Sequence, residues 1–377
     1  MTSLDLAGNW RLSSLDEQIV ALMPVPGDVH TALKNAGVIP DPYVGRNELD
    51  LRWVAEQDWQ IEQDFELSDI DGDWYLDVTD LDTVATIEIN GKIVLQADNC
   101  FRRYRPDVSG VLRQGDNRIR ILFHSSIREG EDRQARQPFY VPYHEGNSPI
   151  ANGNMLRKPQ CHFGWDWNIA LAPLGLYGTI ALRKLEAARI EHVTTQQSHG
   201  EDGVDVTVTV TLFAKAMGAT PLILSFGEEE VRLDVGVRPG ETTVSHVFHV
   251  DAPRLWWPAG SGEQALYRLS VETASETVTR SIGLRTVELL TDADEAGSRF
   301  AFRVNGREIF CRGANWIPAD VLFSLTSLEK TRDLLQSAVD AHMNMIRVWG
   351  GGFIERSERA AEAEASLKAL LATPVAA

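Results

Sequence analysis

The chain has 377 residues, enough for two or three domains at roughly 150 residues each. Its 36 basic and 54 acidic residues give a net charge of −18, a field that disfavours nucleic acid and anionic membrane surfaces as partners. No run of 18 apolar residues occurs, and the first residues lack the pattern of a signal peptide. Cys100, Cys161 and Cys311 have no C-x-x-C spacing, which disfavours a disulfide scaffold or a zinc site. We therefore expect a reduced, cytoplasmic protein.

Residues 1–186 are predicted to form a β-sandwich, most simply a jelly roll. The run Asp73–Val78 is typical of a strand, and Ala85–Ile89 alternates apolar and polar residues. Asn90-Gly91 follows directly, and this pair between alternating runs indicates a hairpin with a type I′ turn. Little helix is expected here, apart from a turn near residues 31–34.

Residues 187–287 continue the β pattern in a simpler form. Val204–Leu212 has a period of two over nine residues, which places its valines on one face. Val231–Val235 and Thr243–Val250 repeat this alternation. About 100 residues of such strands predict an immunoglobulin-like sandwich without a disulfide.

Residues 288–355 change to an α/β pattern. A second Asn-Gly pair, Asn305-Gly306, predicts another hairpin. Thr326–Glu329 has the form of a helix capping box, and the following residues give a helix with one apolar face that ends near His342. Met345–Trp349 then reads as a short buried strand, which completes one strand–helix–strand unit.

Two other segments carry weaker signals. The basic run Arg102, Arg103 and Arg105 is interpreted as a solvated strand edge. Residues 356–377 form an atypical Ala- and Glu-rich tail that is helix-prone but has almost no apolar face. The glutamates of this tail are interpreted as solvated charges.

The densest aromatic and polar cluster is Trp165-Asp166-Trp167 with its neighbours. Tryptophan faces can stack on the C–H surfaces of a neutral polyol, while a carboxylate accepts hydrogen bonds from its hydroxyls. The alternative is that both tryptophans belong to the core and Asp166 caps a loop. On composition alone, the sugar-binding and the core interpretation are about equally supported.

Two more clusters follow the predicted strands of the α/β segment. Arg312–Asp320 contains Asn315 and Trp316, and Arg347–Gly352 contains Trp349. In a (β/α)8 barrel the active site lies at the carboxyl ends of the strands, so both clusters would face one mouth. Ordinary packing at strand ends is the alternative. The glycines of the second cluster lack the Gly-Lys-Ser/Thr ending of a phosphate loop.

Taken together, these motifs resemble the β-mannosidase branch of glycoside hydrolase family 2. The resemblance runs from Trp10 to about Glu355. The branches of this family that act on galactosides and glucuronides usually carry Asn-x-His-Glu where this chain has Asn315–Pro318, a departure that favours the mannosidase branch. The four stretches that carry the resemblance are Phe163–Trp167, Leu255–Pro258, Arg312–Asp320 and Asn344–Gly352.

The resemblance implies a multidomain, mostly β chain: a jelly-roll sugar-binding domain, an immunoglobulin-like sandwich and the start of a (β/α)8 TIM barrel. It implies β-mannosides or manno-oligosaccharides as ligands, retaining hydrolysis by two glutamates, and neither a metal nor an organic cofactor. The residues it implies for substrate binding are Trp165, Asp166, Asn315, Trp316, Arg347 and Trp349.

The catalytic glutamates of the family follow the fourth and seventh barrel strands, whereas this chain has only two such strands. No Asn-Glu pair follows Trp349, so we expect a catalytically incomplete fragment that is inactive in isolation. One alternative function is a stand-alone carbohydrate-binding module. Another is one half of a split glycosidase, completed by a second chain that carries the remaining barrel strands, because two strands leave unpaired backbone edges.

Overall fold

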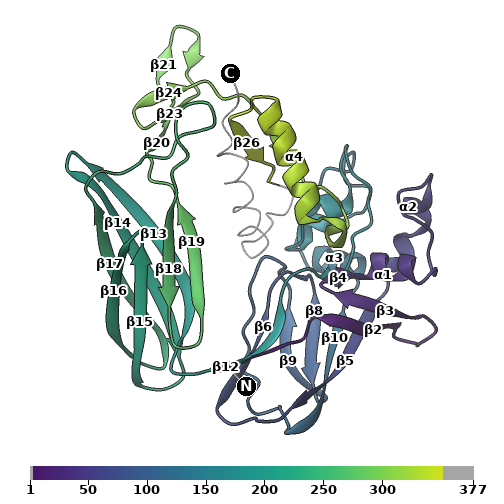
Figure 1. Ribbon diagram of the computed structural model, residues 1–377. Helices are drawn as coiled ribbons and strands as arrows, with labels where there is room; N and C mark the ends of the chain where they lie inside the picture. Colours follow the sequence, from purple (N-terminus) through teal and green to yellow (C-terminus); the bar gives the residue numbers. More distant parts are fainter. Residues whose placement is uncertain (1–2, 351–377) are drawn as a thin grey trace. The chain divides into compact units, whose positions relative to one another are not determined.

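The computed structural model describes residues 3–350. These residues divide into two compact units, each treated by itself below (Figure 1). Unit 1 comprises residues 3–184, 317–327 and 349–350, and unit 2 comprises residues 185–316 and 328–348. The predicted tail, residues 356–377, lies outside the described residues, as do Gly351, Gly352 and Glu355.

Unit 1 is built mainly from short strands with a few helical turns. Its strands are β1 (Ser3–Asp5), β2 (Gly8–Ser14), β3 (Val20–Val25), β4 (Gly27–Asp28), β5 (Trp59–Leu67), β6 (Asp73–Val78), β7 (Leu81–Asp82), β8 (Ala85–Ile89), β9 (Lys92–Ala97), β10 (Gly115–Phe123), β11 (Gly175–Leu176) and β12 (Ile180–Leu185). Its helices are α1 (Val29–Asn35), α2 (Asn47–Asp50), α3 (Ser126–Ala135) and the 3-10 turns η1 (Arg52–Val54), η2 (Gly153–Met155), η3 (Gln160–Phe163) and η4 (Phe323–Leu325).

The main sheet of unit 1 has six strands in the order β3-β2-β5-β10-β8-β9, and β1, β12 and β6 form a second, three-stranded sheet. The tryptophans Trp10, Trp59 and Trp74 are at most 1% exposed in the shared core, which gives this small sandwich much of its buried apolar surface. Asn90 and Gly91 have φ values of 52° and 76°, as the predicted hairpin turn between β8 and β9 requires. The mostly β sandwich predicted for this part of the chain is confirmed.

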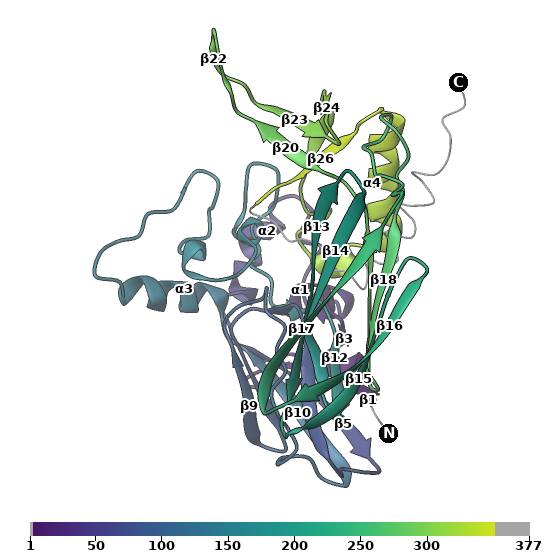
Figure 2. The same cartoon turned by 90° about the vertical axis from the view of Figure 1, so that its left-hand side faces the viewer.

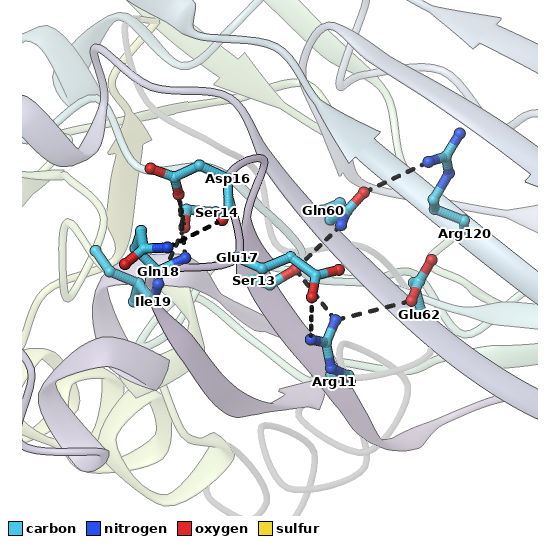
Figure 3. A network of polar contacts seen from close by, with 10 residues as sticks. All are labelled: Arg11, Ser13, Ser14, Asp16, Glu17, Gln18, Ile19, Gln60, Glu62 and Arg120. Atoms are coloured by element: carbon cyan, nitrogen blue, oxygen red, sulfur yellow. Dashed lines mark hydrogen bonds and ion pairs between the residues drawn. The ribbon is translucent and has the colours of Figure 1, made fainter.

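A polar network ties three strands of the six-stranded sheet together (Figure 3). The Gln60 amide on β5 donates to Ser13 Oγ on β2 at 3.1 Å and accepts from Arg120 on β10 at 3.5 Å. Arg11 donates to the same Ser13 oxygen at 3.3 Å and lies 3.9 Å from Glu62. Ser13 is buried, so these bonds satisfy a hydroxyl that would otherwise be costly to bury.

The prediction of a solvated edge for the basic run is wrong for Arg103 and Arg105, whereas Arg102 is exposed. Arg103 donates two hydrogen bonds of 2.6 Å to the fully buried carboxylate of Asp77. Arg105 and Arg183 approach the same carboxylate at 3.5 and 2.8 Å. Burial opposes ionisation, but the three guanidinium groups outweigh it and hold the pKa of Asp77 below its usual value.

Substituting Asp77→Asn should lower the free energy of unfolding by about 1–3 kcal/mol, because the buried, charged hydrogen bonds between the carboxylate and its arginines are lost. Urea unfolding at pH 7 measures this change. The matched control is Asp64→Asn, since Asp64 pairs with Arg118 where both side chains are more than half exposed, and such pairs contribute little. Equal effects of the two substitutions would contradict this assignment.

Helix α3 was not predicted from the sequence. Its cap is Ser125, whose hydroxyl accepts from Arg128 N at 3.1 Å. Only Ser126 and Gly130 of this helix are buried, so it has no apolar stripe that a periodicity search could detect. The helix lies at the edge of unit 1 and leads into the loop of residues 136–152 (Figure 2).

Unit 2 begins with a second sandwich. Its strands are β13 (Arg189–Gly200), β14 (Gly203–Ala214), β15 (Gly218–Phe226), β16 (Glu229–Val237), β17 (Gly240–Val250), β18 (Tyr267–Glu272) and β19 (Thr277–Ile282). They form one sheet in the order β13-β14-β17 and another in the order β16-β15-β18-β19. The alternating valines Val204, Val206, Val208 and Val210 are all buried, which confirms the immunoglobulin-like sandwich.

The rest of unit 2 contains a hairpin region and one strand–helix–strand unit. Its elements are β20 (Val287–Leu290), β21 (Ala293–Asp294), β22 (Gly297–Ser298), β23 (Ala301–Val304), β24 (Arg307–Ile309), β25 (Gly313–Trp316), α4 (Leu328–Asp340) and β26 (Met345–Val348). Strands β25 and β26 pair in parallel, as the first two strands of a (β/α)8 barrel do. Helix α4 begins at Leu328 and His342 follows it with a φ of 55°, so the predicted helix and its end are both present.

Candidate functional site

The loop of residues 158–174 in unit 1 carries the Trp165-Asp166-Trp167 cluster. Gly164 precedes it with a φ of +105°, and a Cβ here would lie 2.6 Å from Pro149 Cδ, so only glycine fits this turn. Within the loop, the Asn168 amide donates to Cys161 O at 2.9 Å and Ala172 N donates to His162 O at 2.7 Å. These bonds fix the conformation of the segment that presents the cluster.

Trp349 belongs to the same compact unit and packs against both tryptophans of the cluster. Its ring centroid lies 5.0 Å from that of Trp165 in a tilted arrangement and 5.6 Å from that of Trp167 edge to face. Both geometries fall within the range that aromatic pairs prefer. All three rings remain partly exposed, so the cluster is an accessible aromatic surface.

A pocket of about 330 Å³ opens beside these rings. Trp165 and Trp349 supply its aromatic wall, together with Phe163. Such a mixture of aromatic faces and a few polar groups is typical of small-molecule sites of this size. The remaining lining residues are Tyr143, His144, Ser148, Gly153, Asn154 and Gln160.

Asp166 is exposed between the two half-buried tryptophans. Among residues 3–350, no side chain or backbone group is hydrogen-bonded to its carboxylate. An ionised carboxylate accepts hydrogen bonds at two oxygens, so Asp166 can accept from the hydroxyls of a ligand that rests on the neighbouring indole rings.

A buried ion pair closes the base of this loop. Lys158 donates from Nζ to Asp82 Oδ2 at 2.5 Å and also donates to Pro173 O, and it is fully buried. Lys158 is the first residue of the loop and Pro173 lies near its end. The ammonium group of Lys158 therefore connects both ends of the loop to Asp82 on strand β7. His162 Nδ1 lies 3.3 Å from the same Asp82 oxygen.

The histidines around this ion pair are held neutral. Burial, with Lys158 adding to it, lowers the pKa of His30 to about 3 and that of His162 to about 4. Burial would raise the pKa of Asp82, but the charge of Lys158 and the contact with His162 outweigh it and lower that pKa to about 2. The base of the loop is therefore a charged pair in a largely apolar surrounding.

Residues 317–327 contribute a second support to the site within unit 1. Ser324 donates from its hydroxyl to the buried Asp28, which also caps helix α1 through Thr31 N at 2.8 Å. Phe323 packs 4.6 Å from the ring of His162. The α/β segment of the sequence therefore helps to hold the cluster-bearing loop.

In unit 2, the parallel pair β25–β26 places Asn315 opposite Arg347. The Arg347 guanidinium donates to Asn315 Oδ1 at 3.0 Å, and both residues are exposed. Trp316 follows Asn315 and is half-buried. The two strand ends thus bring two of the predicted residues into direct contact.

Comparisons with known proteins show to which family the chain belongs. Residues 10–178 match the family described as glycosyl hydrolase 2 galactose-binding domain-like, and residues 188–285 match glycosyl hydrolases family 2. A protein named probable beta-mannosidase from Caenorhabditis elegans is 32% identical over 94% of this chain, and the beta-mannosidase of Capra hircus is 32% identical over 95%. This chain belongs to glycoside hydrolase family 2. Its place is in the β-mannosidase branch.

Solved structures of other proteins share the fold of this family 2 chain. The crystal structure of beta-D-mannosidase from Dictyoglomus thermophilum covers 98% of this chain with a TM-score of 0.90 and 30% identity. An exo-chitosanase from Amycolatopsis orientalis shares the fold at a TM-score of 0.71 and 18% identity. The chain spans 42–43% of the length of the two curated relatives and 46% of the Dictyoglomus chain.

The residues that were predicted to bind substrate are divided between the two units of this family 2 chain. Trp165, Asp166 and Trp349 lie in unit 1, whereas Asn315, Trp316 and Arg347 lie in unit 2. Their role in binding substrate stays a prediction. Among residues 3–350, no group of three or more His, Cys, Asp or Glu side chains could hold a metal ion, and no helix is long and apolar enough to cross a lipid bilayer.

Sequence reasoning missed several residues of the pocket and its base. Tyr143 and His144 lie in the irregular segment after α3, where no periodicity marks them. Lys158 and Asp82 are 76 positions apart, so no local pattern could reveal their contact. The sequence carried no signal for this pair, because a lysine needs an ion-pair partner only where the folded chain buries it.

Proposed function

We propose that this chain carries the sugar-contacting part of a β-mannosidase and that the unit 1 pocket receives the terminal β-mannose residue. The observation that supports this most is the pair of rings of Trp165 and Trp349, which line a pocket of about 330 Å³, with the exposed Asp166 next to Trp165 in the chain. The indole faces cover the apolar C–H surface of the sugar, and Asp166 accepts hydrogen bonds from its hydroxyls. The β-mannosidase relatives support mannose as the sugar.

We expect that the described sugar-contacting part does not hydrolyse a glycoside by itself. Retaining hydrolysis needs two carboxyl groups about 5–5.5 Å apart on either side of the scissile bond. The described barrel strands are β25 and β26, which precede the positions of both family glutamates. We expect no turnover of an aryl β-mannoside by the purified chain, and measurable hydrolysis above the solvent background would contradict this.

Calorimetric titration with methyl β-D-mannoside tests the proposed binding. We expect the wild-type chain to bind and Asp166→Ala to weaken binding by about tenfold or more, because a charge-assisted hydrogen bond contributes about 1.5–3 kcal/mol. Asp234→Ala is the matched control, since Asp234 is an exposed carboxylate on β16 in unit 2. Absence of heat with the wild-type chain, or equal affinity of both variants, would reject the proposal.

A specific observation also favours a partner chain. Leu334 on α4 and Val348 on β26 are 44% and 47% exposed, although both belong to elements that a complete barrel would cover. We propose that these elements accept the remaining strands of a family 2 barrel from a second polypeptide. Mixing the chain with a β-mannosidase fragment that carries those strands should restore hydrolysis, and no activity in the stable mixed complex would exclude this role.

A further inference from the structure

One buried side chain ties both ends of the loop of residues 158–174 to the sandwich of unit 1. Lys158 Nζ donates to Asp82 Oδ2 on β7 at 2.5 Å and also to Pro173 O. The side chains of Lys158 and Asp82 are 0% and 1% exposed. A buried ion pair commonly contributes no more stability than apolar side chains of similar volume would. Stability alone therefore does not explain why this pair is present.

The other contacts at the base of the loop are mostly contacts between rings. The ring centroid of His162 lies 4.6 Å from that of Phe323 and 6.5 Å from that of Tyr177. Packing of apolar groups is non-directional, so it tolerates small shifts of the loop. Charge-assisted hydrogen bonds have defined distances and directions. The Lys158 ammonium group is thus the contact that fixes where the loop begins and where it ends.

Hydrogen bonds within the loop join its two halves. The Asn168 amide donates to Cys161 O at 2.9 Å, and Ala172 N donates to His162 O at 2.7 Å. Each bond connects a residue of the second half to a residue near the start of the loop. A change in the position of the loop ends is therefore passed on to the residues between them.

The residues between these bonds include the aromatic cluster. Trp167 and Trp349 both pack against the small buried cluster of Cys161, Tyr177 and Phe323 at the base of the loop. Trp165 in turn contacts the Trp349 ring, and these two rings line the pocket of about 330 Å³. The position of the pocket wall thus depends on the conformation of the loop.

We propose that Lys158 and Asp82 are positioning residues for the sugar site, whose ion pair holds the loop in the conformation that presents Trp165 and Asp166 to the ligand. Both act through the loop, because their charged groups are buried and neither residue lines the pocket beside Trp165. A loop that is fixed before the ligand arrives loses less conformational entropy on binding. This inference rests on the proposed function, since sugar affinity is its readout.

The double variant Asp82→Asn with Lys158→Met separates positioning from stability. It removes both charges together, so no unpaired charge stays buried and the chain recovers stability relative to Lys158→Met alone. The bonds from Lys158 to β7 and to Pro173 O remain broken. We expect calorimetric titration of the full chain to show that the double variant binds methyl β-D-mannoside about tenfold more weakly than the wild type, because the loop must be ordered on binding.

Hydrogen–deuterium exchange gives a second readout that needs no ligand. The amides of residues 159–173 should exchange about tenfold faster in the double variant, whereas those of β5 and β10 should exchange as in the wild type. The matched control is Lys34→Met with Asp41→Asn, which removes an ion pair of 2.6 Å whose side chains are more than a third exposed. It should change neither sugar affinity nor exchange of the loop.

The possible outcomes separate this inference from the proposed function. Wild-type sugar affinity in the double variant, or wild-type exchange of its loop, would overturn the positioning role and leave the proposed sugar site standing. A double variant that is unfolded, or in which β5 and β10 exchange as much faster as the loop does, would also overturn it, because the pair would then stabilise unit 1 as a whole. Absence of mannoside binding by the wild-type chain would reject the proposed function and this inference together.

Discussion

Replacing Lys158 with methionine should lower the free energy of unfolding of unit 1 by about 3–5 kcal/mol, because removing one partner of a buried ion pair leaves an uncompensated charge. Asp82 would keep its carboxylate at 1% exposure and lose its hydrogen bond of 2.5 Å. The bond that joins Lys158 to Pro173 O would be lost as well. Urea unfolding at pH 7, followed by tryptophan fluorescence, measures this change.

Two further variants make this expectation specific. Lys34→Met removes a lysine from an ion pair of similar length, 2.6 Å, in which both side chains are more than a third exposed, and it should change stability little. The double variant Lys158→Met with Asp82→Asn should be more stable than Lys158→Met alone, because the unpaired charge is gone. A double variant as unstable as the single one would contradict the assignment of a coupled pair.

Acidification from pH 6.5 towards pH 4 should destabilise unit 1 by several kcal/mol through His30 and His162. Burial is the main reason that their pKa values are lowered to about 3 and about 4, against about 6.5 for an unfolded histidine. Between these values the unfolded chain binds more protons than the folded one, so stability falls as pH falls. Asp82, with its pKa lowered to about 2, adds a further loss below about pH 4.

Urea unfolding at intervals between pH 7 and pH 4 measures this effect. The slope of the free energy of unfolding against pH should approach the value for two more protons bound by the unfolded chain than by the folded chain. His30→Phe should remove about one of them, whereas His144→Gln should leave the slope unchanged, because His144 is exposed. A slope that His30→Phe does not alter would show that His30 is not buried neutral in the folded chain.

The local features of both sandwiches could be predicted because short-range patterns determine them. Asn90-Gly91 specifies a turn through its backbone preferences, and the valines of β14 specify a buried face through their period of two. The contact between Arg103 and Asp77 could not be predicted, since the two residues are 26 positions apart and an arginine run has the same composition on an edge or around a buried carboxylate. Helix α3 could not be predicted either. A serine marks the start of a helix in a sequence only when an apolar stripe follows it, and α3 has no such stripe.

The candidate site was predictable only in part. Trp165 and Asp166 stood out as a dense aromatic and polar cluster, and Trp349 followed a recognisable strand. That Trp349 packs on Trp165 depends on the folded chain, since 184 positions separate them. Tyr143 gave no signal, because single aromatic residues in loops occur in cores and surfaces alike.

The most direct measurement is a crystal structure of the chain with methyl β-D-mannoside. We expect a sugar ring in the pocket beside Trp165 and Trp349, with at least one hydroxyl within about 2.5–3.0 Å of an Asp166 carboxylate oxygen. The same crystal form of Asp166→Ala should show an empty pocket. A mannoside bound elsewhere on the chain, or equally well ordered in Asp166→Ala, would contradict the proposed sugar site.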